Sequence, residues 1–353
     1  MRLRVGDLDG VNAKPIVIAE IGTNHNRDFG LAVRLIDGAA AAGCDYVKFQ
    51  IYEPDEIVSG GVTTEDYGWV EKYGHTTARA VFARYLQTPK AWVPELIDRC
   101  RSLDIGWGAT IHGQDGLQWA LEMEPDFVKV ASMDHTNLPL LSLLAQELDV
   151  PILASLGMAP LDAVEQVADA LAESRRGFGL FHCSALYPPD PDSLHLGNIP
   201  YLREQFGVPI GYSDHTMGTK AAVDARELRA GYFEKHITTD RRLSGPDHSF
   251  AMQLDELPHY VDAVRQARPL IARGPFTFTP PSSVEFGNRR RYVKSVISRV
   301  PLRAGEVLSE QDTYLARPGT GIAPADRQFI VGRRMARDVP AETPLQWGDL
   351  HSE

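Results

Sequence analysis

Eight short apolar runs recur along the first two thirds of the chain, each with the composition of a buried strand. They are rich in β-branched and aromatic residues, which is typical of parallel strands covered on both faces. The runs are Ile16–Ile21, Tyr46–Ile51, Ile105–Ile111, Phe127–Ser132, Pro151–Leu156, Phe178–Ser184, Val208–Asp214 and Tyr232–Thr238.

Segments with helical periodicity separate these runs. Repeated alternation of strand and helix predicts an α/β fold, a (β/α)8 TIM barrel. The alternative is a doubly wound open sheet, which usually has fewer strands and a glycine-rich first turn, whereas no G-x-G-x-x-G sequence occurs here. The apolar residues at helical spacing are Leu31, Leu35, Ile36 and Ala39, then Leu117, Ala120 and Leu121, then Val164, Val167, Ala168 and Leu171.

The segment between the second and third strands, residues 52–103, is longer than a usual connection in a barrel. The helix that leads into the third strand is expected to begin only near Lys90. Because the loops that follow barrel strands lie at the catalytic face, we expect this segment to form a lid.

The pattern changes near residue 272. Thr279–Ser283 is rich in proline and serine, Arg289–Arg291 follows it, and the later apolar runs are short and separated by turn residues. We therefore expect a barrel over residues 1–271, a linker over 272–290 and a small β-rich domain over 291–353. The arginine run is expected to be a solvated face of the linker rather than a nucleic-acid site.

Composition limits the classes of partner. The 353 residues include 36 Lys and Arg and 47 Asp and Glu, a formal net charge of −11, which gives no overall attraction to nucleic acid or anionic membranes. No apolar stretch reaches the ~20 residues of a membrane span, and the N-terminus lacks the apolar core of a signal peptide. Cys44, Cys100 and Cys183 lack the spacing of a zinc or redox site. We expect a cytoplasmic protein with reduced cysteines and with no nucleic-acid or membrane partner.

Polar side chains gather where the predicted strands end. In a TIM barrel the functional groups lie at the carboxyl ends of the strands, so these residues are expected to meet in one site. The candidates are Glu20, Gln50, Thr110, His112, Ser132, Asp134, Ser155, Ser184, Tyr187, Ser213, Asp214 and Asp247.

Two lysines, Lys48 and Lys129, stand inside otherwise apolar strands. A buried lysine is costly unless it is paired, so a buried pair needs an explanation. Two cations at one end of a barrel predict an anionic ligand, most simply a phosphate or a carboxylate. The alternative is structural pairing with Glu20 and Glu234.

Two histidines, His215 and His236, lie at the ends of adjacent strands. Neutral imidazoles placed in this way can hold a divalent metal, and hydrogen-bonding roles in the core are the alternative. His112 and His135 are weaker candidates, because histidines in loops are more often exposed to solvent.

Several motifs resemble the N-acetylneuraminate (sialic acid) synthases, and together they span nearly the whole chain. A segment near the C-terminus, Arg317–Ile322, resembles the signature of the antifreeze-like (SAF) domain of that family. The motifs similar to those of the family's barrel are Ile18–Asn26, Val47–Gln50, Gly211–Thr216, Glu234–Thr238 and Gly245–His248.

The resemblance implies a transferase that forms a carbon–carbon bond. C3 of phosphoenolpyruvate would attack the open-chain aldehyde of a 2-acetamido sugar, water would add at C2, and phosphate would leave as a nonulosonic acid forms. A divalent metal, Mn²⁺ or Mg²⁺, would polarise the aldehyde, with His215 and His236 as its ligands.

The same resemblance implies individual roles. In a homodimer with exchanged SAF domains, Arg317 would reach the N-acyl group of the sugar from the partner subunit. The groups implied to take part in catalysis are Glu20, Lys129, Asp134, His215 and His236. Those implied to hold phosphoenolpyruvate or lie beside it are Lys48, Lys129, Ser132, Ser155, Ser213, Gln50 and Thr110. Those implied to contact the sugar are Glu20, Tyr187 and Asp247, with Ser184 as a further substrate contact.

Two positions depart from the family pattern. The strand-four motif of the family usually ends in Glu, whereas Asp134 draws the carboxylate back by one methylene, and Ala185 replaces an Asn that contacts the sugar. Both changes fall on the sugar side. We therefore expect a substrate other than plain N-acetylmannosamine, such as a modified or dideoxy diacetamido sugar.

Two other functions are weighed against this one. Another phosphoenolpyruvate–aldose condensing barrel, of the octulosonate or heptulosonate kind, would lack the SAF motif. A non-catalytic protein that binds sugars or lipid intermediates would be expected to lose residues such as Lys48 and His215 first.

Overall fold

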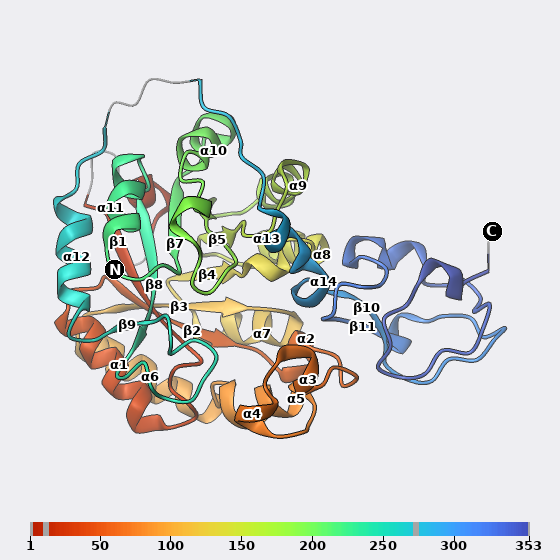
Figure 1. Ribbon diagram of the computed structural model, residues 1–353. Coiled ribbons are helices and arrows are strands. Elements are labelled where there is room, and N and C mark those ends of the chain that lie inside the picture. Colours follow the sequence, from red (N-terminus) through yellow and green to blue (C-terminus); the bar gives the residue numbers. More distant parts are fainter. Residues whose placement is uncertain (1–2, 10–13, 271–274, 352–353) are drawn as a thin grey trace.

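The computed structural model describes residues 3–9, 14–270 and 275–351, and its larger part is a closed barrel (Figure 1). Strands β1 to β8 are parallel and follow in sequence order around the barrel, and β1 also pairs with β8, which closes the sheet. This closure confirms the TIM barrel and excludes the open sheet. The strands are β1 (Ile16–Gly22), β2 (Tyr46–Ile51), β3 (Gly106–Ile111), β4 (Phe127–Val130), β5 (Ile152–Ser155), β6 (Phe178–His182), β7 (Ile210–Asp214) and β8 (Tyr232–Thr238), with a short β9 (Met252–Gln253) beside β8.

Amphipathic helices pack around the strands. The apolar faces expected from the sequence are buried in α1 and α9, whereas Leu121 of α7 is 41% exposed, so the expected stripe is wrong at that position. Among the described residues, no helix combines the length and the apolar character that a bilayer span requires. The helices are α1 (Phe29–Ala41), α6 (Val93–Ser102), α7 (Gln114–Met123), α8 (Leu138–Glu147), α9 (Leu161–Leu171), α10 (Asn198–Phe206), α11 (Lys220–Glu227) and α12 (Leu257–Gln266).

Residues 52–92, the lid segment, fold into short helices around an apolar cluster of their own. The cluster includes Tyr52, Tyr67 and Phe82, whose burial gives this long connection a defined structure. The segment therefore forms a layer at the rim of the barrel. Its elements are α2 (Pro54–Ile57), α3 (Thr64–Tyr67), α4 (Val70–Tyr73), α5 (Ala78–Val81), a π-helical turn over Phe82–Leu86 and a 3₁₀ turn over Lys90–Trp92.

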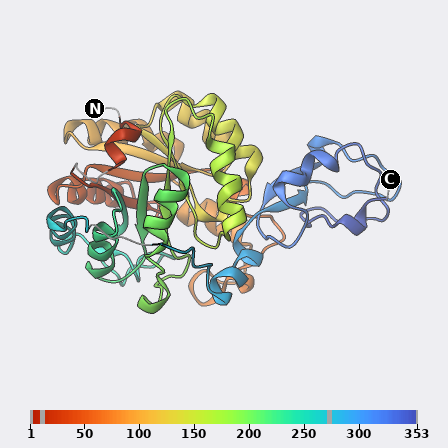
Figure 2. The ribbon, with the colours of Figure 1, turned by 90° about the horizontal axis from the view of Figure 1, so that it is seen from above.

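The C-terminal domain, residues 293–351, stands to one side of the barrel with a separate apolar core (Figures 1 and 2). Its two strands, β10 (Ser295–Ser298) and β11 (Thr313–Ala316), are antiparallel. Two short helices, α13 (Ser283–Gly287) and α14 (Arg289–Tyr292), lead into it. The expected start of the linker at residue 272 lies outside the described residues.

The linker helices are attached to the barrel. Glu285 of α13 is buried and accepts backbone N–H bonds from Met158 at 3.1 Å and from Ala185 at 2.7 Å. Arg289 donates to the carbonyl of Met158 at 3.2 Å, so the arginine run is not wholly the solvated face that the sequence predicted. These contacts hold the C-terminal domain close to the rim of the barrel.

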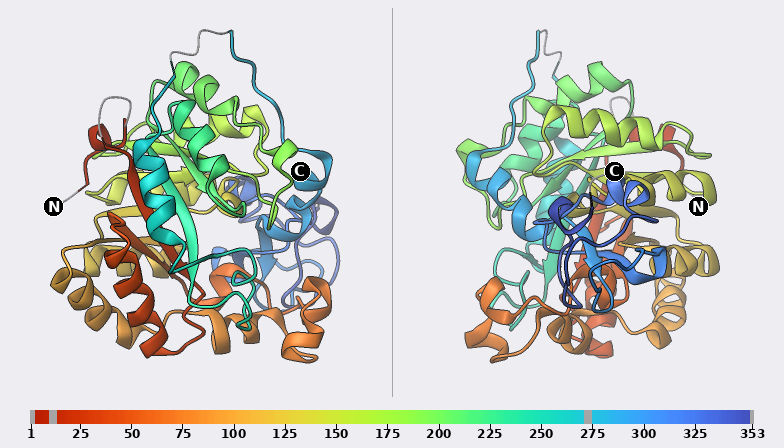
Figure 3. Two further views of the ribbon diagram at one scale, coloured as in Figure 1. Left: turned by 60° about the vertical axis from the view of Figure 1, so that its left-hand side comes forward. Right: turned by 90° about the vertical axis from the view of Figure 1, so that its right-hand side faces the viewer.

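The C-terminal domain also contacts the lid segment, beside which it lies in Figure 3. The backbone N–H of Ser59 donates to the carbonyl of Arg317 at 2.9 Å, and the N–H of Arg317 donates to Ile57 at 3.1 Å. Glu342 accepts from the N–H of Gly60 at 2.5 Å and from Arg79 at 2.6 Å. The barrel, the lid segment and the C-terminal domain thus meet along one edge.

We expect Glu342→Ala to loosen this edge, because Gly60 would lose the acceptor of its N–H group. Amide hydrogen exchange at Gly60 should accelerate by about 10-fold, the effect of losing one charge-assisted hydrogen bond. Glu306→Ala is the control, since Glu306 caps the N–H of Arg303 within the C-terminal domain. Equal exchange at Gly60 in both variants would contradict a role for Glu342 in holding the lid segment.

Candidate functional site

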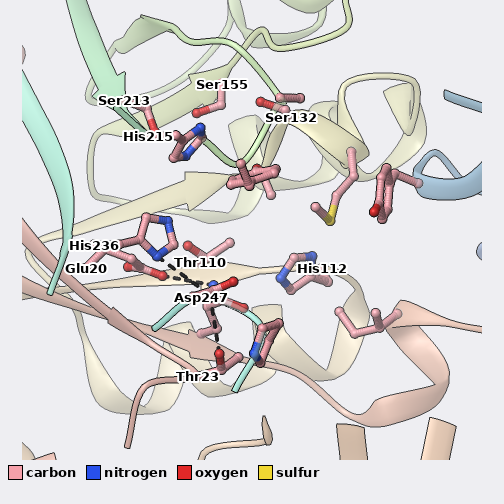
Figure 4. Close-up of a pocket in the computed structure, with 18 of the residues that line it drawn as sticks. Glu20, Thr23, Thr110, His112, Ser132, Ser155, Ser213, His215, His236 and Asp247 are labelled. Atoms are coloured by element: carbon pink, nitrogen blue, oxygen red, sulfur yellow. Dashed lines mark hydrogen bonds and ion pairs between the residues drawn. The ribbon is translucent and has the colours of Figure 1, made fainter. Parts of the chain in front are cut away.

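A cavity of about 270 Å³ opens where the strands end (Figure 4). Of the fifteen residues to which the resemblance gave a role in catalysis or binding, thirteen line it. The two that do not are Asp134 and Ser184. The thirteen are Glu20, Lys48, Gln50, Thr110, Lys129, Ser132, Ser155, Tyr187, Ser213, His215, His236, Asp247 and Arg317.

The two lysines are paired with two glutamates inside the barrel. Lys48 Nζ lies 2.5 Å from Glu20 Oε2 and 3.5 Å from Glu234 Oε2, and Lys129 forms an ion pair with Glu234. All four side chains are buried. The structural pairing that the sequence left open is therefore present, while both lysines still line the cavity.

The cavity wall carries as many carboxylates as cations. Arg317 joins the two lysines, and Asp247 joins Glu20 and Glu234. Burial raises the pKa of Asp247 to about 6, with a contribution from the nearby Glu20 carboxylate. Burial also raises the pKa of Glu20 despite its contact with Lys48. These two are the carboxyl groups that protonate most readily, and their protonation leaves the wall cationic.

Glu234 is the firmly ionised member of the cluster. Burial acts to raise its pKa, but Lys129 and Lys48 outweigh burial and lower it. Ser213 donates a further hydrogen bond to Glu234 Oε1 at 2.9 Å. Glu234 is therefore the fixed negative charge that holds both ammonium groups at the wall of the cavity.

Three serine hydroxyls lie across the cavity from two of its carboxylates (Figure 4). Figure 4 shows Ser132, Ser155 and Ser213 on the side of His215, with Glu20 and Asp247 on the side of His236. The buried hydroxyl of Ser155 has no hydrogen-bond partner among the described residues. An oxygen-rich ligand at this wall would satisfy it.

The two histidines, His215 and His236, lie with their ring centroids 5.4 Å apart. His215 Nδ1 donates to the carbonyl of Ser184 at 2.7 Å, which leaves the lone pair on Nε2. Burial lowers the pKa of His215 to about 4 and that of His236 well below its usual range. Both rings are therefore neutral near pH 7 and able to bind a metal.

These two nitrogen donors fit part of a divalent metal site. The described residues contain no group of three or more His, Cys, Asp or Glu side chains arranged to hold a metal ion. The buried Nδ1 of His236 has no hydrogen-bond partner among them and lies 3.6 Å from Asp247 Oδ2. A metal bound here would keep open positions for substrate or water.

The two residues off the cavity wall contribute indirectly. Ser184 supplies the carbonyl that orients His215, and the substrate contact that the resemblance implied for it stays a prediction. Asp134 lies behind His112, where it accepts from His112 Nδ1 at 2.6 Å and pairs with Lys294 Nζ at 2.8 Å. Burial opposes ionisation of Asp134, but Lys294 and His112 lower its pKa. The part in catalysis that the resemblance implied for Asp134 stays a prediction.

Arg317 enters the cavity of its own barrel. The sequence led us to expect it from a partner subunit, but the backbone bonds to Ile57 and Ser59 place it here within one chain. Its guanidinium lies 5.9 Å from the ring centre of Phe82 and 5.8 Å from that of Tyr292. The homodimer with exchanged domains stays a prediction.

Sequence reasoning missed the aromatic part of the wall. For the three in the lid segment the signal was present, because an aromatic cluster in a segment already expected to be a lid indicates a ligand-facing surface. His112, a strand-end candidate that was weighed as a weak metal ligand, also lines the cavity. The missed aromatic residues on the wall are Tyr67, Trp69, Phe82, Phe250 and Tyr292.

Comparison with known proteins gives two matches to family models. Residues 35–274 match the NeuB family, and residues 293–351 match the SAF domain. The chain is 31% identical over 344 residues to the N,N'-diacetyllegionaminic acid synthase of Legionella pneumophila, covering 95% of this chain and 94% of that protein. It is 32% identical over 361 residues to the N-acetylneuraminate-9-phosphate synthase of Drosophila melanogaster, covering 93% and 94%.

A solved structure is similar over the full length of both chains. The crystal structure of the spore coat polysaccharide biosynthesis protein SpsE of Bacillus subtilis matches with a TM-score of 0.82 and 29% identity, covering 100% of each chain. Fold, sequence and domain order therefore agree, and this chain is an enzyme of the NeuB family with a C-terminal SAF domain.

Proposed function

We propose that this transferase condenses phosphoenolpyruvate with the open-chain aldehyde of an N-acylated amino sugar, releasing phosphate and a nonulosonic acid. The observation that carries the proposal is one cavity lined by two buried lysines, two neutral histidines and the Ser155 hydroxyl, which has no hydrogen-bond partner among the described residues. The names of the relatives support the product class.

Each end of phosphoenolpyruvate has suitable partners. Lys48 and Lys129 would pair with its phosphate and carboxylate, and Ser132 and Ser155 would donate hydrogen bonds to the same oxygens. Ser213 would donate as well once its O–H turns away from Glu234. As C3 bonds to the aldehyde carbon, water adds at C2 and the C–O bond to phosphate breaks. The lysines would hold the charge that gathers on the departing phosphate.

The opposite side of the cavity would receive the sugar. Glu20 and Asp247 would accept hydrogen bonds from its hydroxyl groups, and Tyr187 and Arg317 would close over it. When bound at His215 and His236, Mn²⁺ or Mg²⁺ would supply a Lewis acid for the aldehyde oxygen. The neutral rings and the carbonyl that holds His215 suit that task.

We further propose that the sugar is not plain N-acetylmannosamine. Ala185 lines the cavity with a methyl group, and the carboxylate of Asp134 is withdrawn from the wall. A substrate with an acylamino or deoxy group in place of a hydroxyl would suit this less polar surface. A modified or dideoxy diacetamido sugar meets that description.

The test is phosphate release from phosphoenolpyruvate in the presence of Mn²⁺ and single sugars. We expect release with a dideoxy diacetamido sugar at a kcat/KM at least about 10-fold above that for N-acetylmannosamine, the discrimination given by one or two altered contacts. If no sugar in the panel leads to phosphate release, the condensing activity is overturned and a non-catalytic protein is favoured. Equal rates with all sugars would overturn the altered-substrate proposal alone.

A further inference from the structure

His112, at the end of β3, has one ring nitrogen fixed and the other facing the cavity. Nδ1 donates to Asp134 Oδ2 at 2.6 Å. The side chain is 3% exposed, and Nε2 has no hydrogen-bond partner among the described residues. A buried acceptor without a partner is costly, so it points to a ligand that supplies a donor.

The orientation of His112 depends on the C-terminal domain. Lys294 of that domain pairs with Asp134 Oδ1 at 2.8 Å and donates to the carbonyl of His112. Both side chains of this ion pair are at most 1% exposed. Docking of the C-terminal domain therefore neutralises the charge of Asp134 and fixes the backbone and the ring of His112 together.

Burial keeps the ring of His112 neutral, against the charge of Asp134. Burial lowers the pKa of His112, while Asp134 raises it and Lys294 and Arg317 lower it. Because the ionised Asp134 can only accept, Nδ1 carries the proton and Nε2 keeps its lone pair. His112 therefore offers the cavity an acceptor.

The neighbours of His112 place this acceptor on the sugar side. Tyr52 of the lid segment packs edge-on at 5.7 Å between ring centres. Figure 4 shows His112 on the side of Asp247 and Glu20, opposite Ser132, Ser155 and Ser213. A group of the sugar is thus better placed to meet Nε2 than the phosphate of phosphoenolpyruvate.

We propose that His112 Nε2 accepts a hydrogen bond from an N–H or O–H group of the amino sugar, and that Asp134 and Lys294 position His112 for this recognition. The proposal rests on the proposed function and names one specificity-determining contact within it. It also assigns a role to Asp134, whose side chain is one methylene shorter than Glu, because Asp134 positions His112 and does not contact the substrate.

The experiment compares His112→Phe and His112→Gln in the full chain, with phosphoenolpyruvate, Mn²⁺ and the best sugar of the panel. Loss of the acceptor in His112→Phe should raise KM for the sugar about 10- to 100-fold, with KM for phosphoenolpyruvate within about twofold. His112→Gln retains an acceptor at a similar reach and should recover part of the loss. His182→Gln, a buried histidine bonded to the carbonyl of Leu194, is the matched control and should leave both KM values unchanged.

A second measurement tests the positioning without activity. In ¹⁵N spectra of histidine-labelled protein, His112 should show a protonated Nδ1 and an unprotonated Nε2. In Asp134→Asn the side-chain oxygen should stay with Lys294 and the amide should face Nδ1, which moves the ring proton to Nε2. Unchanged His112 signals in that variant would overturn the positioning.

The outcomes separate the inference from the proposed function. Phosphate release by the wild type with an unchanged sugar KM in His112→Phe would overturn the inference alone. A fall in kcat with an unchanged sugar KM would do the same and indicate proton transfer instead. Absence of phosphate release by the wild type would overturn the proposed function and the sugar contact with it.

Discussion

Replacing Lys48 with methionine is expected to abolish phosphate release and to lower the free energy of unfolding by about 3–5 kcal/mol, the usual effect of leaving a buried charge unpaired. Lys48 lies within ion-pair distance of both Glu20 and Glu234, and all three side chains are buried. Denaturant unfolding and the phosphate assay measure the two effects separately.

The double variant Lys48→Met with Glu20→Gln distinguishes pairing from ligand binding. It removes one charge of each sign, so it should recover much of the lost stability while phosphate release stays absent. Recovery of activity together with stability would show that Lys48 serves only to pair with Glu20. Full activity in Lys48→Met alone would contradict its proposed contact with phosphoenolpyruvate.

A surface pair provides the matched control. Lys220 and Asp224 form an ion pair at 2.6 Å on α11, and the Lys220 side chain is 85% exposed. Lys220→Met should leave both the unfolding free energy and phosphate release nearly unchanged, because solvent already screens that charge. The contrast isolates the effect of burial from that of deleting an ammonium group.

The two lysines also show which properties of the site could be predicted from the sequence alone. Their position in apolar strands predicted burial and a need for opposite charge, and both are confirmed. Pairing and ligand binding were treated as alternatives, yet in the structure the lysines are paired and still face the cavity. The sequence pattern identifies which residue is buried, but it does not show how many charged groups contact that residue.

The barrel was predictable because its signal is periodic and repeated. Strand ends were less so: β4 ends at Val130 and β6 at His182, each two residues before the predicted end. The extra residues in each case include a serine, Ser132 or Ser184, that belongs to the turn at the cavity. Short polar residues continue an apparent strand pattern after the hydrogen-bonded ladder has stopped.

Contacts between distant segments were beyond the reach of the sequence. Nothing in the local pattern around Lys294 indicates that it closes an ion pair with Asp134, which follows β4. The docking of Arg317 on its own barrel likewise follows from backbone bonds to Ile57 and Ser59. Such contacts depend on how the C-terminal domain settles on the lid segment, which composition and periodicity leave open.

The double variant His215→Ala with His236→Ala is expected to bind no divalent metal at the proposed site and to lower kcat about 1,000-fold or more, since Lewis-acid assistance contributes several kcal/mol to such reactions. The two rings supply the neutral nitrogen donors at the end of the barrel, and the carbonyl of Ser184 fixes the tautomer of His215. Metal content after equilibration with Mn²⁺ and dialysis measures the first effect, and phosphate release measures the second.

His135→Gln is the control for this pair, because His135 is equally buried and also bonds through Nδ1 to a carbonyl, that of Ser132 at 2.5 Å, but does not line the cavity. It should retain the metal, since the ring lies behind the wall and not on it. Unchanged metal content in the double variant would remove His215 and His236 as ligands. Loss of the metal without loss of phosphate release would instead assign the metal a role in stability, and the aldehyde would then depend on the lysines and on Arg317 for its polarisation.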